Sequence, residues 1–187
     1  MRLNKGDVII FPTDTVYGIG AKIDDHIGMD KIYEIKHRPK EKRLSVLCAD
    51  IEAISSIAYV TEDAKKLIEK YMPGGLTLIL NSKEEIRNDY IFETIAVRIP
   101  DHELAIRILQ ENGPMATTSV NTSGQAPMNE YIDIVKHFGE KVLYVYPNTV
   151  NSSKVSSTII DLTGSEVTLI REGKLKFNEI VNFLNNK

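Results

Sequence analysis

Short runs of β-branched and aromatic residues alternate along this chain with longer segments whose apolar residues recur at helical spacing. Runs of the first kind are typical of strands, and segments of the second kind are typical of amphipathic helices. Their alternation predicts an α/β (α+β) domain with a mixed sheet. We predict strands at Val8–Phe11, Leu44–Ala49, Leu76–Leu80, Ile95–Ile99, Val142–Tyr146, Thr158–Leu162 and Val167–Ile170.

Two helices are predicted from capping residues as well as periodicity. Thr61 is a candidate N-cap for a helix over Thr61–Met72, which Pro73-Gly74-Gly75 would end. Asp101 follows a proline and is the candidate cap of a helix over Asp101–Asn112. No repeat or linker-like stretch divides the chain, so we expect one domain over residues 1–187. Weaker periodicity predicts helices at Ile27–His37, Glu130–Phe138 and Phe177–Asn186.

The composition restricts the class of protein further. With 42% hydrophobic and 26% charged residues, the chain is not a disordered or fibrous protein. Its single cysteine, Cys48, can form neither an internal disulfide nor a multi-thiolate metal site, which favours a reducing compartment. No apolar run reaches the length of about 20 residues that a spanning helix needs. We therefore expect a cytoplasmic protein with no membrane segment.

Established catalytic signatures are missing from the sequence. Gly18-Ile19-Gly20 lacks the third glycine of a dinucleotide fingerprint, and there is no P-loop and no nucleophile elbow. The four histidines show no paired metal-ligand spacing, so we predict no metal site. A nucleotide site, if present, must be of an unconventional kind.

One segment concentrates positive charge. Lys36–Arg43 holds five basic residues and one acid, a local charge of +4, while the net charge of −3 leaves −7 for the rest of the chain. If the segment is extended, Lys36 and Arg38 point to the same side and suit a polyphosphate. The alternative is a solvated run of charge. A broad nucleic-acid surface is disfavoured because the chain as a whole is acidic.

Three further segments carry polar groups next to predicted strands. Phe11–Gly20 places two threonines, an aspartate and a tyrosine in a turn after the first strand. Arg98 lies inside the apolar run Ile95–Pro100, where it either faces water or is held for a carboxylate or phosphate. Thr117–Ser123 has six hydroxyl or amide side chains in seven positions. A capping turn and a ligand-free turn are the alternative interpretations of the first and third segments.

Five motifs in this order resemble the YrdC family of threonylcarbamoyl-AMP synthases. They are Pro12–Gly18 (PTDTVYG), Lys36–Pro39 (KHRP), Pro73–Leu80 (PGGLTLIL), Ala96–Pro100 (AVRIP) and Thr118–Gly124 (TSVNTSG). Each motif alone is weak, but five in order at plausible spacings are specific. The match runs from about Asp7 to Gly173 and is similar to the short, single-domain bacterial form, without the C-terminal domain of longer members. It implies a YrdC-like fold with a twisted, mixed open sheet flanked by helices.

The resemblance also implies a reaction. L-threonine, bicarbonate or CO2, and ATP would give threonylcarbamoyl-AMP and pyrophosphate, with Mg2+ assisting the departure of pyrophosphate. A threonylcarbamoyl transferase complex would then modify the adenosine beside the tRNA anticodon. The carbamate formed on threonine attacks the α-phosphorus, so little side-chain acid or base chemistry is needed if the reactants are held close.

The family pattern assigns roles to particular residues. Lys36 and Arg38 would be catalytic through contact with the ATP phosphates, and the resemblance places the nucleotide against Lys36, Arg38, Lys42, Thr94, Asn121 and Arg171. It places L-threonine against Thr15, Arg98, Ser119 and Ser157. The sequence departs from the pattern at five positions: His37 where many members have glycine, Arg43 where many have proline, Leu47 where some have histidine, Ser156 where proline is usual and Glu172 where proline is common.

Two other functions remain open from the sequence. The same fold serves inside HypF-type carbamoyltransferases, so a carbamoyl-adenylating relative is one alternative, although the zinc-finger and acylphosphatase-like regions of those proteins are missing here. A non-catalytic RNA-binding or ribosome-assembly module is the other, with weak tRNA or RNA binding through the +4 segment. The sequence lacks an RNA-recognition motif and a second basic stripe, which counts against it.

Overall fold

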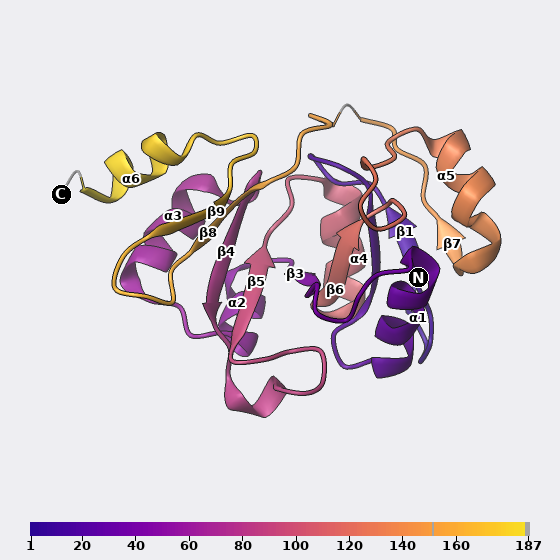
Figure 1. Ribbon diagram of the computed structural model, residues 1–187, viewed down its shortest axis with the longest axis horizontal. Helices are drawn as coiled ribbons and strands as arrows, with labels where there is room; N and C mark the ends of the chain where they lie inside the picture. The colour runs from indigo at the N-terminus through magenta and orange to yellow at the C-terminus, as the bar shows by residue number, and fades with distance from the viewer. Residues whose placement is uncertain (151, 186–187) are drawn as a thin grey trace.

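A nine-stranded mixed sheet forms the centre of the computed structural model, which describes residues 1–150 and 152–185 (Figure 1). The strand order is β7-β1-β2-β6-β3-β5-β4-β8-β9. Pairing is parallel for β7 with β1, β3 with β5 and β4 with β8, and antiparallel elsewhere, so the predicted mixed sheet is confirmed. The strands are β1 (Ile9–Phe11), β2 (Gly18–Lys22), β3 (Ser45–Leu47), β4 (Leu76–Asn81), β5 (Thr94–Arg98), β6 (Met115–Ser119), β7 (Tyr144–Val145), β8 (Thr158–Asp161) and β9 (Thr168–Arg171).

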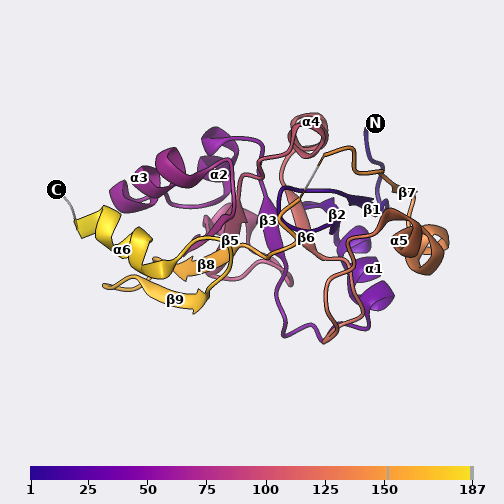
Figure 2. The same cartoon turned by 90° about the horizontal axis from the view of Figure 1, so that it is seen from above.

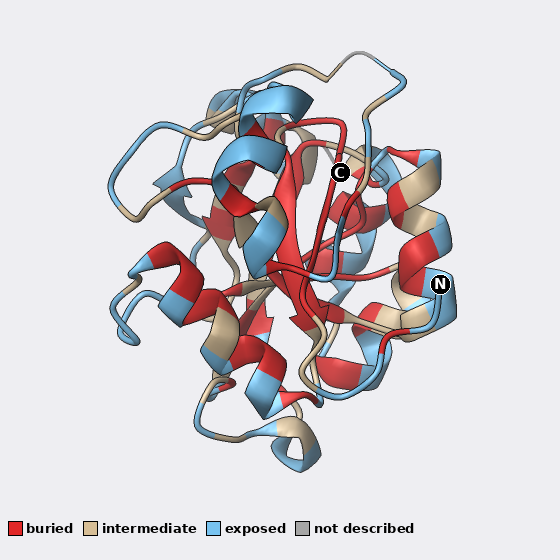
Figure 3. Cartoon of the chain, turned by 90° about the vertical axis from the view of Figure 1, so that its right-hand side faces the viewer, coloured by how far each residue is buried: buried red, intermediate tan, exposed pale blue. Residues whose placement is uncertain are grey.

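Six α-helices cover this sheet. In Figure 2, α2, α3 and α4 lie on one side of it and α1 lies on the other. Side chains in and just before β1 point alternately to the two faces of the sheet. Ile9 and Phe11 pack with α4 on one face, while Val8 and Ile10 pack with α1 on the other. Figure 3 shows the resulting pattern, with buried strands inside and helices exposed on their outer faces. The helices are α1 (His26–Lys36), α2 (Ile51–Ile57), α3 (Glu62–Tyr71), α4 (Glu103–Asn112), α5 (Tyr131–Phe138) and α6 (Phe177–Asn185).

Two strands and one helix were not predicted from the sequence. β2 contains two glycines, and β6 lies in a stretch that the sequence presented as a polar turn. Gly20 has a structural reason: a Cβ there would lie 2.6 Å from Thr117 Cγ2 on the paired strand. The two strands therefore approach closely because glycine faces a β-branched threonine. The third missed element is the short helix α2.

Of the two predicted helix caps, one is confirmed and one is wrong. Thr61 is the N-cap of α3, and its side chain accepts a hydrogen bond from the amide of Ala64 at 3.3 Å. Asp101, however, does not cap α4: the helix begins at Glu103, and its N-cap residue is His102, which makes no side-chain capping bond. The amide of Asp101 instead donates to Asp14 Oδ1 at 3.1 Å. Within the described residues, no helix has the length and apolar character needed to cross a membrane.

Candidate active site

A polar cavity of about 270 Å³ lies where the loop after β1 meets the ends of β5, β6 and β9 and the start of β8. Four arginines line it, and the described residues that line it include no Asp or Glu. We call this cavity the arginine chamber. Its hydroxyl groups come mainly from the loop after β1, from β6 and from the segment that precedes β8. Such a lining suits an anion with several negative charges. The four arginines are Arg38, Arg43, Arg98 and Arg171.

A second cavity of about 190 Å³ adjoins the first, and we call it the apolar chamber. Its lining is dominated by aliphatic and aromatic side chains, among them Met29, Ile79 and Tyr90. Arg43, Ser45 and Ile159 belong to both linings, so the two chambers meet at these residues. A ligand that joins a flat apolar ring to a polyanionic group fits this pair of chambers.

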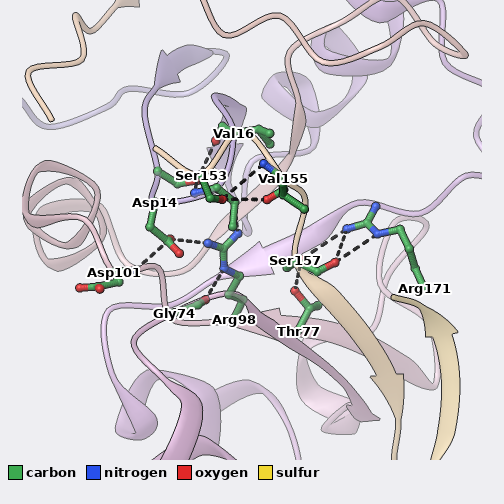
Figure 4. A network of polar contacts seen from close by, with 12 residues as sticks. Asp14, Val16, Gly74, Thr77, Arg98, Asp101, Ser153, Val155, Ser157 and Arg171 are labelled. Carbon is green, nitrogen blue, oxygen red and sulfur yellow. Dashed lines mark hydrogen bonds and ion pairs between the residues drawn. The ribbon is translucent and has the colours of Figure 1, made fainter. Parts of the chain in front are cut away.

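Arg98 is the most deeply buried cation of the arginine chamber, with 6% of its surface exposed. Its guanidinium forms an ion pair with Asp14 and donates to the Gly74 carbonyl at 2.8 Å (Figure 4). It also donates to Thr15 Oγ1 at 2.7 Å. Burial lowers the pKa of Arg98, and the carboxylate of Asp14 opposes that shift. Arginine nevertheless stays charged in proteins, so the chamber holds a fixed cation.

A second polar group lies at the start of β8. Ser157 Oγ is 2.8 Å from Thr77 Oγ1 on β4, and Arg171 Nη2 donates to the Ser157 carbonyl at 2.9 Å (Figure 4). The amide of Ser153 donates to the carbonyl of Asp14 at 2.8 Å. Residues 152–157, which we call the crossing segment, therefore tie β8 to the loop after β1 across the arginine chamber.

Lys36 lies at the C-terminal end of α1 and not on an extended segment, so the condition under which it would point to the same side as Arg38 is not met. The helix ends at Lys36, and His37 adopts a left-handed conformation with φ of 49°. The chain therefore turns between the two cations. Lys36 is 1% exposed and donates to the carbonyls of Ser119 and Asn121, the latter at 2.6 Å, and to Asn121 Oδ1 at 3.0 Å.

Burial lowers the pKa of Lys36 to about 7, and the positive charge of Arg38 adds to the shift. The three acceptors around Nζ match the three N–H groups of an ammonium. Asn121 Oδ1 also accepts from Ser119 Oγ at 2.7 Å. Lys36 and Asn121 thus lie behind the chamber wall and hold Ser119 in place at its surface.

The basic segment brings two of its five cations to the chamber. Arg38 is held by its donation to the carbonyls of Lys42 at 2.9 Å and Arg43 at 2.8 Å. Lys42 itself is exposed and lies outside both linings. Thr94 lines the apolar chamber and accepts a hydrogen bond from Arg43 Nη1 at 2.9 Å.

The structure thus brings six of the ten expected residues to the arginine chamber and places Thr94 in the apolar one. Lys36, Asn121 and Lys42 lie outside both linings. Sequence reasoning did not assign site roles to Asp14 or Thr77. Asp14 was visible only as an acid in a turn, and Thr77 as one polar residue in an apolar run. The six residues of the arginine chamber are Thr15, Arg38, Arg98, Ser119, Ser157 and Arg171.

A family model and several known proteins match most of this chain. A family model for the Sua5, YciO and YrdC proteins, described as "Telomere recombination", matches residues 1–173. A putative threonylcarbamoyl-AMP synthase of Methanocaldococcus jannaschii is 37% identical over 175 residues, which cover 94% of this chain and 84% of that protein. A threonylcarbamoyl-AMP synthase of Bacillus subtilis is 32% identical over 183 residues, which cover 95% of this chain and 53% of that protein.

Two solved structures share the fold. The structure of Pyrococcus abyssi Sua5 complexed with L-threonine has a TM-score of 0.91 and 32% identity, and the match covers 96% of this chain and 54% of that one. The structure of Escherichia coli YciO has a TM-score of 0.82 and 28% identity, covering 91% of this chain and 85% of that one. The chain spans about half the length of the Bacillus and Pyrococcus relatives. By sequence and by fold, the chain belongs to the Sua5/YciO/YrdC family.

Proposed function

We propose that this chain makes threonylcarbamoyl-AMP from L-threonine, bicarbonate or CO2, and ATP, and releases pyrophosphate. The observation that carries the proposal is the arginine chamber, whose described lining has no Asp or Glu, which contains the buried cation Arg98 and which adjoins the apolar chamber. The similarity to a Sua5 structure that contains L-threonine supports an amino-acid site in the same fold.

Threonine would occupy the Arg98 end. The guanidinium already donates to three acceptors, which leaves two of its five N–H groups for a substrate carboxylate. Hydroxyl groups of Thr15, Ser119 and Ser157 line the same chamber and can bind the polar groups of threonine. A charge-assisted pair of this kind fixes the amino acid so that its amine faces the centre of the chamber.

The chemistry then forms a C–N bond and a P–O bond, and it breaks an N–H bond of the amine and the bond between the α-phosphorus and the departing pyrophosphate. The threonine amine adds to CO2 and loses a proton, which gives a carbamate. A carbamate oxygen attacks the α-phosphorus of ATP as the bond to the β-phosphate oxygen breaks, and pyrophosphate leaves with the electron pair. When bicarbonate is the carbon source, water is released as well. Fixed cations that stabilise the phosphate charge are the main contribution asked of the protein.

ATP would lie across both chambers, with its base in the apolar chamber near Thr94 and its phosphates near Arg38 and Arg171. Lys36 and Asn121 are proposed to act indirectly, since their contacts hold Ser119. Lys42 supports Arg38 through its backbone carbonyl. In this arrangement Thr94, Arg38 and Arg171 would contact ATP. The remaining three expected residues, Lys36, Asn121 and Lys42, would support other residues of the site.

The described residues of the arginine chamber offer no carboxylate to Mg2+, whereas protein sites for this ion with nucleotides usually supply one or two. The lining therefore does not fit an ion held by side chains of the protein. In this proposal Mg2+ enters only as the counterion of ATP, and no step is assigned to it.

The product would serve a threonylcarbamoyl transferase complex that modifies tRNA, and the chain would work in the cytoplasm. Direct RNA binding as the main function is less well supported. Of the five cations in Lys36–Arg43, one is buried, two line the arginine chamber, and Lys40 pairs with Asp30 at 2.9 Å. Little of the +4 charge is therefore left for an RNA backbone.

Pyrophosphate release tests the proposal. With L-threonine, bicarbonate and MgATP all present, we expect steady release, and omission of either threonine or bicarbonate should reduce it to the background of the enzyme-free reaction. Release with carbamoyl phosphate in place of threonine and bicarbonate would favour the carbamoyl-adenylating alternative. Absence of any turnover together with tight, salt-sensitive RNA binding would favour the RNA-binding one.

A further inference from the structure

Arg43 occupies a position that the reaction above does not use. Three described residues line both chambers, and among Arg43, Ser45 and Ile159 only the arginine carries a charge. A ligand that extends from one chamber into the other must pass this side chain. The other arginines of the site line the arginine chamber alone.

The guanidinium of Arg43 is held in place although the residue is exposed. Its Nη1 donates to Thr94 Oγ1 at 2.9 Å, and its central carbon lies 4.4 Å from the centre of the Phe92 ring. The carbonyl of Arg43 accepts from Arg38 Nη2 at 2.8 Å, which fixes the backbone as well. Stacking on an aromatic ring orients a guanidinium, and ordering before binding lowers the entropic cost of binding.

Among the described residues, most of the hydrogen-bonding capacity of this side chain remains free for a ligand. A guanidinium has five N–H groups, and Arg43 donates one of them to Thr94. The described lining residues around it are uncharged or cationic, so a phosphate at the junction meets no competing carboxylate among them. These features match a group that binds one phosphate of a chain rather than a surface charge in solution.

We propose that Arg43 binds the phosphate next to the nucleoside, at the point where a nucleotide passes from the apolar chamber into the arginine chamber. The inference rests on the proposed function, since it requires a nucleotide at this site. Arg43 would thus have a role that differs from those of Arg38 and Arg171. It would bind the α-phosphate and thereby set the position of the phosphorus that reacts.

Calorimetric titration of adenosine, AMP and ATP tests this inference. Arg43→Gln should weaken AMP and ATP binding about tenfold or more, the size expected for loss of a charge-assisted hydrogen bond. Adenosine affinity should change by less than twofold, because adenosine has no phosphate. Arg107→Gln is the matched control: it removes one exposed arginine from α4, lies outside both linings, and should leave all three affinities within twofold.

Three other results would overturn the inference. If Arg43→Gln weakened the binding of adenosine and of AMP equally, Arg43 would only hold Thr94 and Phe92 in position. Unchanged AMP and ATP binding would show that it binds no phosphate, while ATP binding by the unmodified protein would leave the proposed function intact. If the unmodified protein binds neither AMP nor ATP, both proposals fail. Thermal unfolding of each variant confirms that the fold is retained.

Discussion

Single residues of this site hold charge inside the protein only because other residues compensate it. The ion pair of Arg98 with Asp14 joins β5 to the loop after β1, and both side chains are more than nine-tenths buried. A buried pair of this kind adds little net stability when complete, but removal of one partner leaves an uncompensated charge. Removal of either side chain should therefore lower the free energy of unfolding by more than the intact pair adds to it.

Arg98→Met should accordingly lower the free energy of unfolding by about 3–5 kcal/mol, because the Asp14 carboxylate stays buried without its cation. Urea denaturation measures this change. The double variant with Asp14→Asn should be less destabilised than Arg98→Met alone, since the stranded charge is gone. Strict additivity of the two substitutions would contradict the coupling.

Lys36 makes stability depend on pH. Its native pKa of about 7 lies below its ordinary value of 10.5, so between these values the unfolded chain holds a proton that the native protein has released. Stability conferred by this group is lowest below pH 7, where both states are protonated, and rises with pH above 7, by up to about 1.4 kcal/mol per unit.

The comparison of the native protein with Lys36→Met from pH 6 to pH 9 isolates this effect, because other titrating groups cancel in the difference. We expect the difference in unfolding free energy to stay flat up to about pH 7 and then to shift in favour of the native sequence. A difference that is constant up to pH 9 would show that burial does not lower the pKa of Lys36.

At the scale of elements, the β8 and β9 region depends on one close backbone approach. A Cβ on Gly173 would overlap the carbonyl oxygen of Ser156 and lie 2.6 Å from the carbonyl carbon of Ser157. The amide of Gly173 also donates to Thr158 Oγ1 at 2.9 Å. Glycine here lets the chain after β9 rest on the crossing segment, which keeps Ser157 in the arginine chamber.

Gly173→Ala should therefore destabilise the protein by about 1–3 kcal/mol, the range for overpacking a close contact, and should weaken threonine binding. Gly164→Ala is the control, because a Cβ at that position meets nothing nearer than the Glu166 carbonyl at 3.9 Å. Urea denaturation and calorimetric titration of threonine measure the two effects. Equal behaviour of the two variants would show that the close approach at Gly173 is unimportant.

Elements with a strong local signal could be predicted from the sequence, and those that depend on distant partners could not. The strand β4 and the Thr61-capped helix α3 follow from periodicity and capping. β6 was missed because its threonines and serine look like a turn until β2 and β3 pair with it. Arg98 was recognised as unusual in an apolar strand, yet its partner Asp14 is 84 residues away and no local pattern indicates it.

At the scale of the whole molecule, the chain concentrates cations at one place and leaves the rest acidic. Its net charge is −3, yet four arginines line a single chamber whose described lining has no acid. Such a distribution suits a small polyanionic substrate, because it focuses positive potential at the cleft without coating the surface. The adjoining apolar chamber can bind a second, uncharged part of that substrate.

We propose that threonine, inorganic carbon and ATP combine here into one product. The most direct measurement supplies 13C-labelled bicarbonate with L-threonine and MgATP and follows the nucleotide products by mass spectrometry. We expect a product that contains AMP, threonine and one labelled carbon, formed in step with pyrophosphate and absent without threonine. Release of pyrophosphate with no labelled carbon attached to AMP would contradict it.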